Sequence, residues 1–120
     1  DDAKVRERLR MLAAALAEYR RDNGDVPKEL EDLVPKYVAD KDLLKCPVTG
    51  EPFSYQFSAS TEFQGSTYRE AKLKQLKDPD IGEYVPIIRE KGVLKNGNVI
   101  NLSYGGEIYE SGGGWEVLFK

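Results

Sequence analysis

The clearest pattern along the chain is a helical stripe of apolar residues near its N-terminus. Spacings of four, three, four and three residues separate Val5, Leu9, Leu12, Leu16 and Tyr19. At about 100° per residue, these spacings gather the side chains within about 80° of arc on one helix face. Asn23-Gly24 follows, and glycine commonly stands just after the last helical residue. The pattern therefore predicts a helix over residues 2–22.

The opposite side of this predicted helix mixes small and charged residues. It carries Ala3, Ala14 and Ala17 among Arg6, Arg10, Arg21, Glu7 and Glu18, with Met11 to one side. Alanine is the best helix former, so these alanines can simply fill solvent-facing positions. A low surface of mixed charge also suits close packing by other helices. The sequence alone leaves both interpretations open.

A shorter helical pattern begins at Pro27. Leu33, Val34 and Tyr37 follow Leu30 by three, four and seven residues, a spacing that places all four side chains on one helix face. Pro35 lacks the N–H that a continuing helix needs, so the second helix should close around Val34. Residues 36–45 then read as a crossing loop that is anchored by its apolar members.

Strand patterns follow in the second half of the chain. Aromatic and polar residues alternate over Phe53–Phe57, and Pro52 before them suits an outer strand or a strand start. Residues 58–84 are polar and weakly patterned, with a helical turn or two expected over 70–77. Pro86 predicts that the apolar segment 85–89 lies at a sheet edge.

The last part of the chain is rich in glycine and predicts a β-meander. Segments 98–104 and 107–109 flank Gly105-Gly106, which predicts a two-residue hairpin turn. After a further run of three glycines, a final strand is predicted from the alternation of Trp115, Val117 and Phe119.

These elements predict one α+β domain over residues 1–120. A long N-terminal amphipathic helix (1–23) should pack on a small antiparallel sheet. An irregular loop with a short second helix and the first strand occupies 24–57, a variable loop 58–84, and the meander 85–120. The apolar stripe of the helix should cover the apolar face of the sheet.

Composition narrows the function classes. The 120 residues include 18 basic and 21 acidic side chains, one cysteine and no histidine. Without histidine the chain lacks the commonest general base and zinc ligand, and it has no Ser-His or Cys-His nucleophile. No stretch reaches the roughly 20 consecutive apolar residues of a spanning helix. We therefore expect a protein that binds or assembles, and not an enzyme.

Two groups of residues are candidates for metal sites. Cys46-Pro-Val-Thr-Gly resembles one arm of a zinc knuckle but has no second arm, so a buried apolar role for Cys46 is favoured. Asp78, Asp80 and Glu83 place three carboxylates in one turn-forming stretch. They suit an ordinary polar loop, a calcium site as the alternative, or the acid–base pair of a hydrolase. We expect no cofactor.

Phosphate and nucleic-acid binding are not favoured. The glycines at 105–106 and 112–114 do not precede a helix N-terminus, so they are interpreted as turns. A local basic cluster is bracketed by acids and predicts a solvated face; it consists of Arg69, Lys72, Lys74 and Lys77.

The order of these features resembles the periplasmic part of the type IV pilin-like family, most closely the major pseudopilin of type II secretion. In that family the first helix ends in a segment of the form Leu-x-x-Tyr-x-x-Asp-Asn-Gly-x-Tyr-Pro. The matching residues here are Leu16, Tyr19, Asp22, Asn23, Gly24 and Pro27, with Val26 in place of the aromatic. The resemblance covers residues 3–57. Such chains often carry a second, paired cysteine late in the domain, where this chain has Glu90.

The resemblance implies a role that the residues alone do not. The helix at 2–22 would be the membrane-distal half of a longer helix, whose apolar first half anchors the precursor in the bacterial inner membrane. After leader cleavage and methylation, such subunits join other pilins or pseudopilins in a filament, on an inner-membrane assembly platform. The globular domain would lie in the periplasm or outside the cell. A secreted non-enzymatic module that binds a ligand or adheres through residues 58–83 is the alternative.

Overall fold

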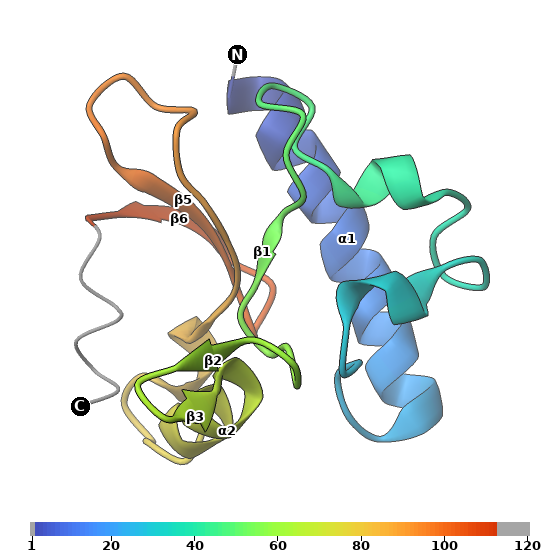
Figure 1. Ribbon diagram of the computed structural model, residues 1–120, viewed down its shortest axis with the longest axis vertical. Helices are drawn as coiled ribbons and strands as arrows, with labels where there is room; N and C mark the ends of the chain where they lie inside the picture. The colour runs from blue at the N-terminus through green and yellow to red at the C-terminus, as the bar shows by residue number, and fades with distance from the viewer. Residues whose placement is uncertain (1, 113–120) are drawn as a thin grey trace.

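A long helix packed on an antiparallel sheet is the main feature of the fold (Figure 1). The computed structural model describes residues 2–112. Helix α1 (Asp2–Asn23) lies against one face of a four-stranded sheet, in which the strand order is β1-β4-β5-β6 and every pair is antiparallel. The strands are β1 (Ser54–Tyr55), β4 (Pro86–Glu90), β5 (Val99–Ser103) and β6 (Ile108–Ser111). The α+β class is confirmed.

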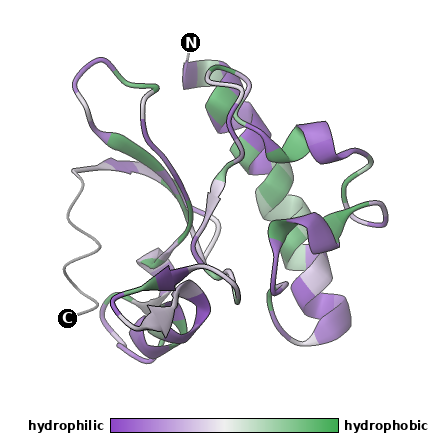
Figure 2. Ribbon diagram, viewed as in Figure 1, coloured by the Kyte–Doolittle hydropathy of each residue, from purple (hydrophilic) through white to green (hydrophobic). Residues whose placement is uncertain are grey.

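The apolar stripe of α1 forms one side of the core, as predicted. Val5, Leu9 and Leu12 are completely buried, and they cluster with apolar side chains of the sheet, among them Ile88, Ile100 and Leu102. Figure 2 shows this division along α1, where apolar and polar residues alternate around the helix. The helix ends one residue later than predicted. Gly24 follows in a left-handed conformation with φ of +81°.

The second predicted helix is only one turn long. It is the 3₁₀ helix η1 (Leu30–Leu33), and it closes at Val34 as predicted. Pro35 explains this stop, because it cannot donate the next backbone hydrogen bond. The predicted crossing loop contains a further 3₁₀ turn, η2 (Lys41–Leu44), which the sequence pattern did not indicate.

Two strand predictions need correction. The prediction that Pro86 marks an edge is wrong, because β4 lies between β1 and β5. A proline is tolerated there because it is the first residue of the strand, and the register with β5 shifts between Pro86 and Ile88. The predicted strand over Phe53–Phe57 shrinks to β1, which does lie at the sheet edge as expected.

The hairpin between β5 and β6 has a longer turn than predicted. The Ser103 N–H donates to the Glu107 carbonyl oxygen at 2.8 Å, so three residues, 104–106, form the loop. Gly106 takes the left-handed position of that loop, with φ of +92°. The predicted final strand at 115–119 lies outside the described residues.

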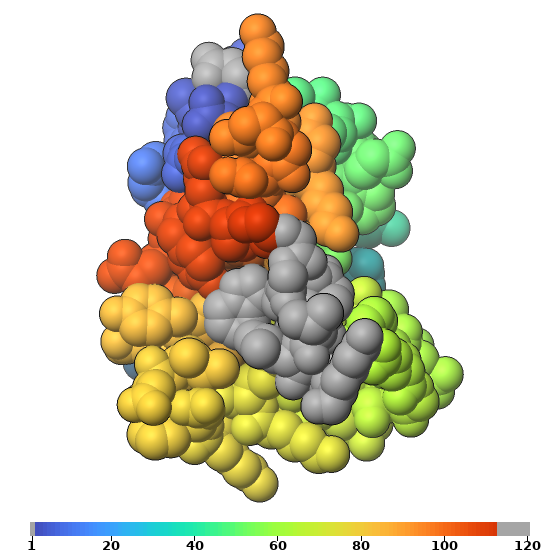
Figure 3. Space-filling view, turned by 90° about the vertical axis from the view of Figure 1, so that its left-hand side faces the viewer, coloured from blue at the N-terminus to red at the C-terminus, as the bar shows by residue number. Residues whose placement is uncertain are grey.

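Residues 58–84 contain more regular structure than the sequence indicated. A hairpin of β2 (Glu62–Phe63) and β3 (Ser66–Thr67) leads into α2 (Tyr68–Gln75) and then the 3₁₀ turn η3 (Gly82–Tyr84). The expected helical segment at 70–77 therefore begins two residues earlier. In Figure 3, which views the molecule from the side away from α1, residues 75–84 lie below β6. The Tyr109 hydroxyl, on β6, donates to the Tyr84 carbonyl oxygen at 2.7 Å.

Candidate functional site: an exposed helix face and a cavity at the sheet edge

The face of α1 that points away from the sheet forms a continuous exposed surface. We call the following six residues the exposed face of α1: Ala3, Glu7, Arg10, Ala14, Ala17 and Arg21. Successive members are three or four residues apart, so they lie along one side of the helix. Arg6, which was predicted to share this surface, is half-buried and forms ion pairs with Asp2 at 2.9 Å and Glu110 at 3.1 Å.

The side chains of this surface are suited to packing against another helix. Its alanines project only a methyl group, so another helix can approach the backbone closely. Its charged members have opposite signs, and a second copy of the same surface can pair with them. The arrangement therefore suits association with another helix.

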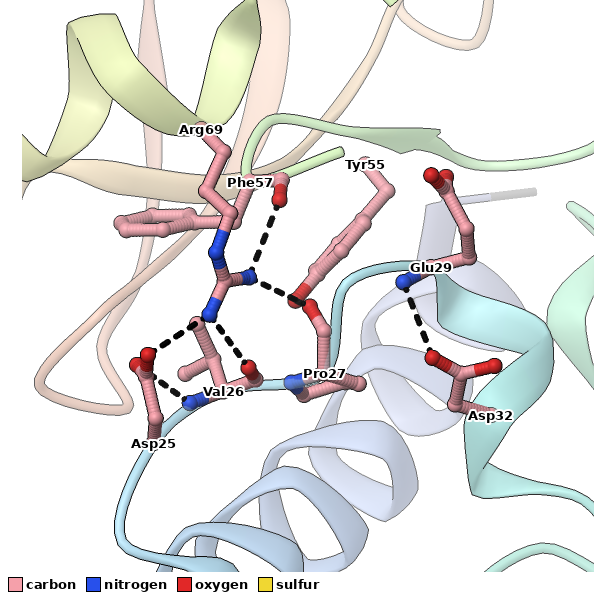
Figure 4. A network of polar contacts seen from close by, with 8 residues as sticks. All are labelled: Asp25, Val26, Pro27, Glu29, Asp32, Tyr55, Phe57 and Arg69. Carbon is pink, nitrogen blue, oxygen red and sulfur yellow. Dashed lines mark hydrogen bonds and ion pairs between the residues drawn. The ribbon is translucent and has the colours of Figure 1, made fainter. Parts of the chain in front are cut away.

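A polar network beside the C-terminal end of α1 joins segments that are distant in the sequence (Figure 4). At its centre is Arg69 of α2, whose side chain is 14% exposed. Its guanidinium donates four hydrogen bonds of 2.6–3.3 Å, to the Asp25 carboxylate and the carbonyl oxygens of Val26, Pro27 and Phe57. The Tyr55 hydroxyl also donates to the Pro27 carbonyl oxygen, at 2.5 Å. This network fixes the variable segment 58–84 to the chain that follows α1.

The network corrects the interpretation of the basic cluster. Arg69 is committed to internal acceptors, and Lys72 is completely buried, where its Nζ donates to Gln75 Oε1 at 3.4 Å. The prediction of a solvated face is therefore wrong for Arg69 and Lys72. Lys74 and Lys77 are exposed, as predicted.

Next to the network lies a cavity of about 620 Å³, which we call the sheet-edge cavity. One wall comes from η1 and η2, and the other from residues 52–61 and α2. Its lining includes Glu29, Leu30, Lys41, Leu44, Phe53, Tyr55 and Tyr68. This volume lies in the range of small-molecule and peptide sites.

A second cavity, of about 320 Å³, adjoins the first. The two cavities share three lining residues, namely Pro52, Ser54 and Tyr68. The second is strongly polar, because its lining also includes the buried side chains of Gln56, Arg89 and Glu90. Together the cavities follow both sides of β1 at the edge of the sheet.

Glu90 is the most strongly perturbed carboxyl group near these cavities. Burial raises the pKa of Glu90 to about 7; a hydrogen bond with Cys46 opposes this shift, and the charge of Glu51 adds to it. Cys46 is 1% exposed and forms no disulfide, so its predicted buried role is confirmed. The structure thus places Glu90 against Cys46, at the position where the family resemblance expects a partner cysteine.

The three carboxylates for which calcium binding was the alternative, Asp78, Asp80 and Glu83, lie on an exposed turn. Asp78 Oδ1 accepts from the Asp80 N–H at 2.8 Å, a contact that closes the turn locally. Among residues 2–112, no group of three or more Cys, Asp and Glu side chains is arranged to hold a metal ion, and this includes Asp78, Asp80 and Glu83.

The sequence contains one further signal for this region, at the start of α2. Thr67 and Glu70 form a capping box, in which the Glu70 N–H donates to Thr67 Oγ1 at 3.1 Å and the Thr67 N–H donates to Glu70 Oε1 at 3.2 Å. The Thr-x-x-Glu spacing could have placed the start of α2. No local signal indicates that Arg69 reaches Asp25, because 44 residues separate them.

Comparison of the chain with protein-family models, with curated proteins and with solved structures gives no match. Within the part of the chain that the structure describes, no helix is long and apolar enough to cross a membrane.

Proposed function

We propose that this chain is a structural subunit of a filament of the type IV pilin class, either a type II secretion pseudopilus or a pilus-like fibre, and that it has no catalytic activity. The observation that carries the proposal is the exposed face of α1. It continues directly into the helix-end sequence Asp22-Asn23-Gly24, followed by Pro27, that resembles the pilin-like family.

The two sides of α1 support this proposal because they differ so sharply. The buried side packs within one subunit, in one cluster with apolar residues of the sheet and of η1. The other side presents alanines and charges of both signs over the length of the helix, which is about 30 Å for 22 residues. A repeating subunit needs such a helix, with one face for its own core and one for its neighbours.

The first test uses the gene sequence that precedes Asp1. We expect about 20 apolar residues after a short basic leader that ends in glycine, because one spanning helix needs that length. The precursor would then be anchored in the inner membrane, with this domain in the periplasm or outside the cell. Absence of such a segment contradicts the proposal.

The second test breaks the exposed face of α1 in the full-length protein. Ala14→Glu places a bulky charge at the centre of that face and should abolish filaments seen by electron microscopy. Ala39→Glu is the matched control, because Ala39 is exposed in the loop before η2. Normal filaments from the Ala14→Glu protein would refute the role of this face.

A second candidate function is a non-enzymatic ligand-binding module. The sheet-edge cavity favours it, since Ser58, Thr61 and Tyr68 of the variable segment line that cavity. A full-length protein that stays monomeric and soluble would favour this function over filament assembly.

A further inference from the structure

Strand β1 presents a hydrogen-bonding edge at Tyr55. In an antiparallel pair, residues that exchange hydrogen bonds alternate with residues that do not. The Gln56 N–H donates to the Ile87 carbonyl oxygen at 2.8 Å, in the same register that pairs β1 with β4. The N–H and C=O of Tyr55, one residue earlier, therefore point away from β4 and toward the outer edge.

That outer edge is occupied on either side of Tyr55. The Phe53 N–H donates to the Leu44 carbonyl oxygen at 3.1 Å, and the Phe57 carbonyl oxygen accepts from Arg69 at 3.3 Å. From the described residues, no hydrogen bond reaches the backbone N–H or C=O of Tyr55. This gap in the edge lies in the lining of the sheet-edge cavity.

The geometry of the gap defines the chemistry of a ligand. A strand residue with an outward N–H and C=O is complemented by one residue of an extended peptide. Directly opposed residues project their side chains to the same face of a sheet. The opposing residue would therefore point to the side of the Tyr55 ring, where Leu30, Leu44 and Phe53 line the cavity. An apolar side chain fits there.

The residues on either side of that apolar residue would point the other way. On that face lie Ser54, Gln56 and the buried Arg89, which line the second cavity. Polar or charged side chains fit this environment, and Tyr68 provides an aromatic surface between the two cavities.

We propose that an extended peptide segment of a partner protein binds beside Tyr55 as an additional strand, with an apolar residue in the sheet-edge cavity and polar residues on both sides of it. This inference deepens the second candidate function by naming its ligand class. It does not depend on filament assembly.

The experiment selects ligands from a phage-displayed random heptapeptide library on the whole chain. The enriched sequences should share one apolar residue between two polar ones. The synthetic consensus peptide is then titrated by calorimetry. N-methylation of the central amide removes the donor to the Tyr55 carbonyl oxygen and should weaken binding about tenfold. N-methylation of the next amide, which points away from β1, is the control and should change affinity less than about twofold.

A substitution in the protein tests the contribution of the cavity to peptide binding. Lys41→Trp fills the cavity from an exposed lining position whose side chain forms no hydrogen bond with the described residues, and it should also weaken peptide binding about tenfold. Lys95→Trp, at an exposed position outside both cavities, should bind normally. No enrichment, or binding that survives both the central methylation and Lys41→Trp, overturns the inference. Filaments without peptide binding would refute the inference alone, and peptide binding without filaments would refute the filament proposal alone.

Discussion

Helices α1 and α2 are attached to the molecule by opposite kinds of contact. Helix α1 buries an apolar stripe and exposes charged residues and alanines. Helix α2 buries Lys72 and Gln75 and leaves Leu73 37% exposed. The Gln75 Nε2 atom is buried with no hydrogen-bond partner. Hydrophobic burial therefore positions the first helix, whereas polar contacts position the second.

This contrast shows when a periodic apolar pattern is enough to predict where a helix packs. A helix of 22 residues can place many apolar side chains on one face, and the area that they bury decides where the helix lies. A helix of eight residues has too few turns for that, and its capping box and Arg69 hold it instead. Substitutions in the two helices and in the sheet can test this contrast.

Truncation of the α1 stripe should have the largest effect. Leu12→Ala removes a completely buried side chain from the core, and it should lower the free energy of unfolding by about 2–5 kcal/mol. Leu73→Ala on α2 is the matched control and should cost less than about 0.5 kcal/mol. Urea denaturation monitored by circular dichroism measures both. Equal losses would break the contrast between the helices.

A buried carboxyl on the sheet face that α1 covers should make stability depend on pH. The pKa of Glu90 is about 7 in the folded chain and near its ordinary 4.5 when unfolded. The protonated form therefore favours folding, so this stabilisation is complete below about pH 4.5 and is lost as pH rises through about 7. The loss should reach about 3 kcal/mol at pH 8.

Glu90→Gln isolates that contribution, because the amide does not titrate. Relative to the wild type, the variant should gain stability between pH 4.5 and pH 8, which denaturation at a series of pH values detects. The pKa of Asp2 is lowered, chiefly by its hydrogen bond to Arg6, but this opposite shift is common to both proteins and cancels in the difference. A constant difference across this range would contradict the assignment.

Arg69→Lys tests the polar attachment of α2. Lysine keeps the charge but cannot donate to four acceptors at once, so the variant should be less stable by about 2 kcal/mol. Amide exchange over residues 58–84 should also become faster. Lys74→Ala, on the exposed side of the same helix, should change neither quantity. Unchanged exchange in Arg69→Lys would show that the network does not hold this segment.

The smallest effect should come from the capping box of α2. Thr67→Ala removes the side-chain acceptor for the Glu70 N–H and should cost about 1 kcal/mol. The hydrogen bonds from Thr67 also hold the pKa of Glu70 below its ordinary value, so the box should weaken in acid. Ser66→Ala is the control, and amide exchange within α2 is the measurement. Identical protection in the two variants would exclude a role for the cap.

The two candidate sites, like the two helices, differ in how far the sequence predicts them. The exposed face of α1 could be derived from helical spacing, apart from Arg6, which turned inward to meet Glu110. The sheet-edge cavity could not be derived, because its walls come from η1, η2 and the variable segment, which are not neighbours in the sequence. The sequence has Glu90 where the pilin-like resemblance expects a cysteine, but the burial of Glu90 against Cys46 depends on the fold.

Helix α1, its buried stripe, its end near Gly24 and the α+β class could all be predicted from the sequence. These features depend on local spacing and on local backbone preference, which a single chain displays directly. Three other features depend on the tertiary fold: β4 is an inner strand despite Pro86, Lys72 is buried, and Arg69 donates to the Pro27 carbonyl oxygen. These features depend on which distant segments supply hydrogen-bond acceptors or bury a side chain. The local periodicity of the sequence carries no information about such distant segments.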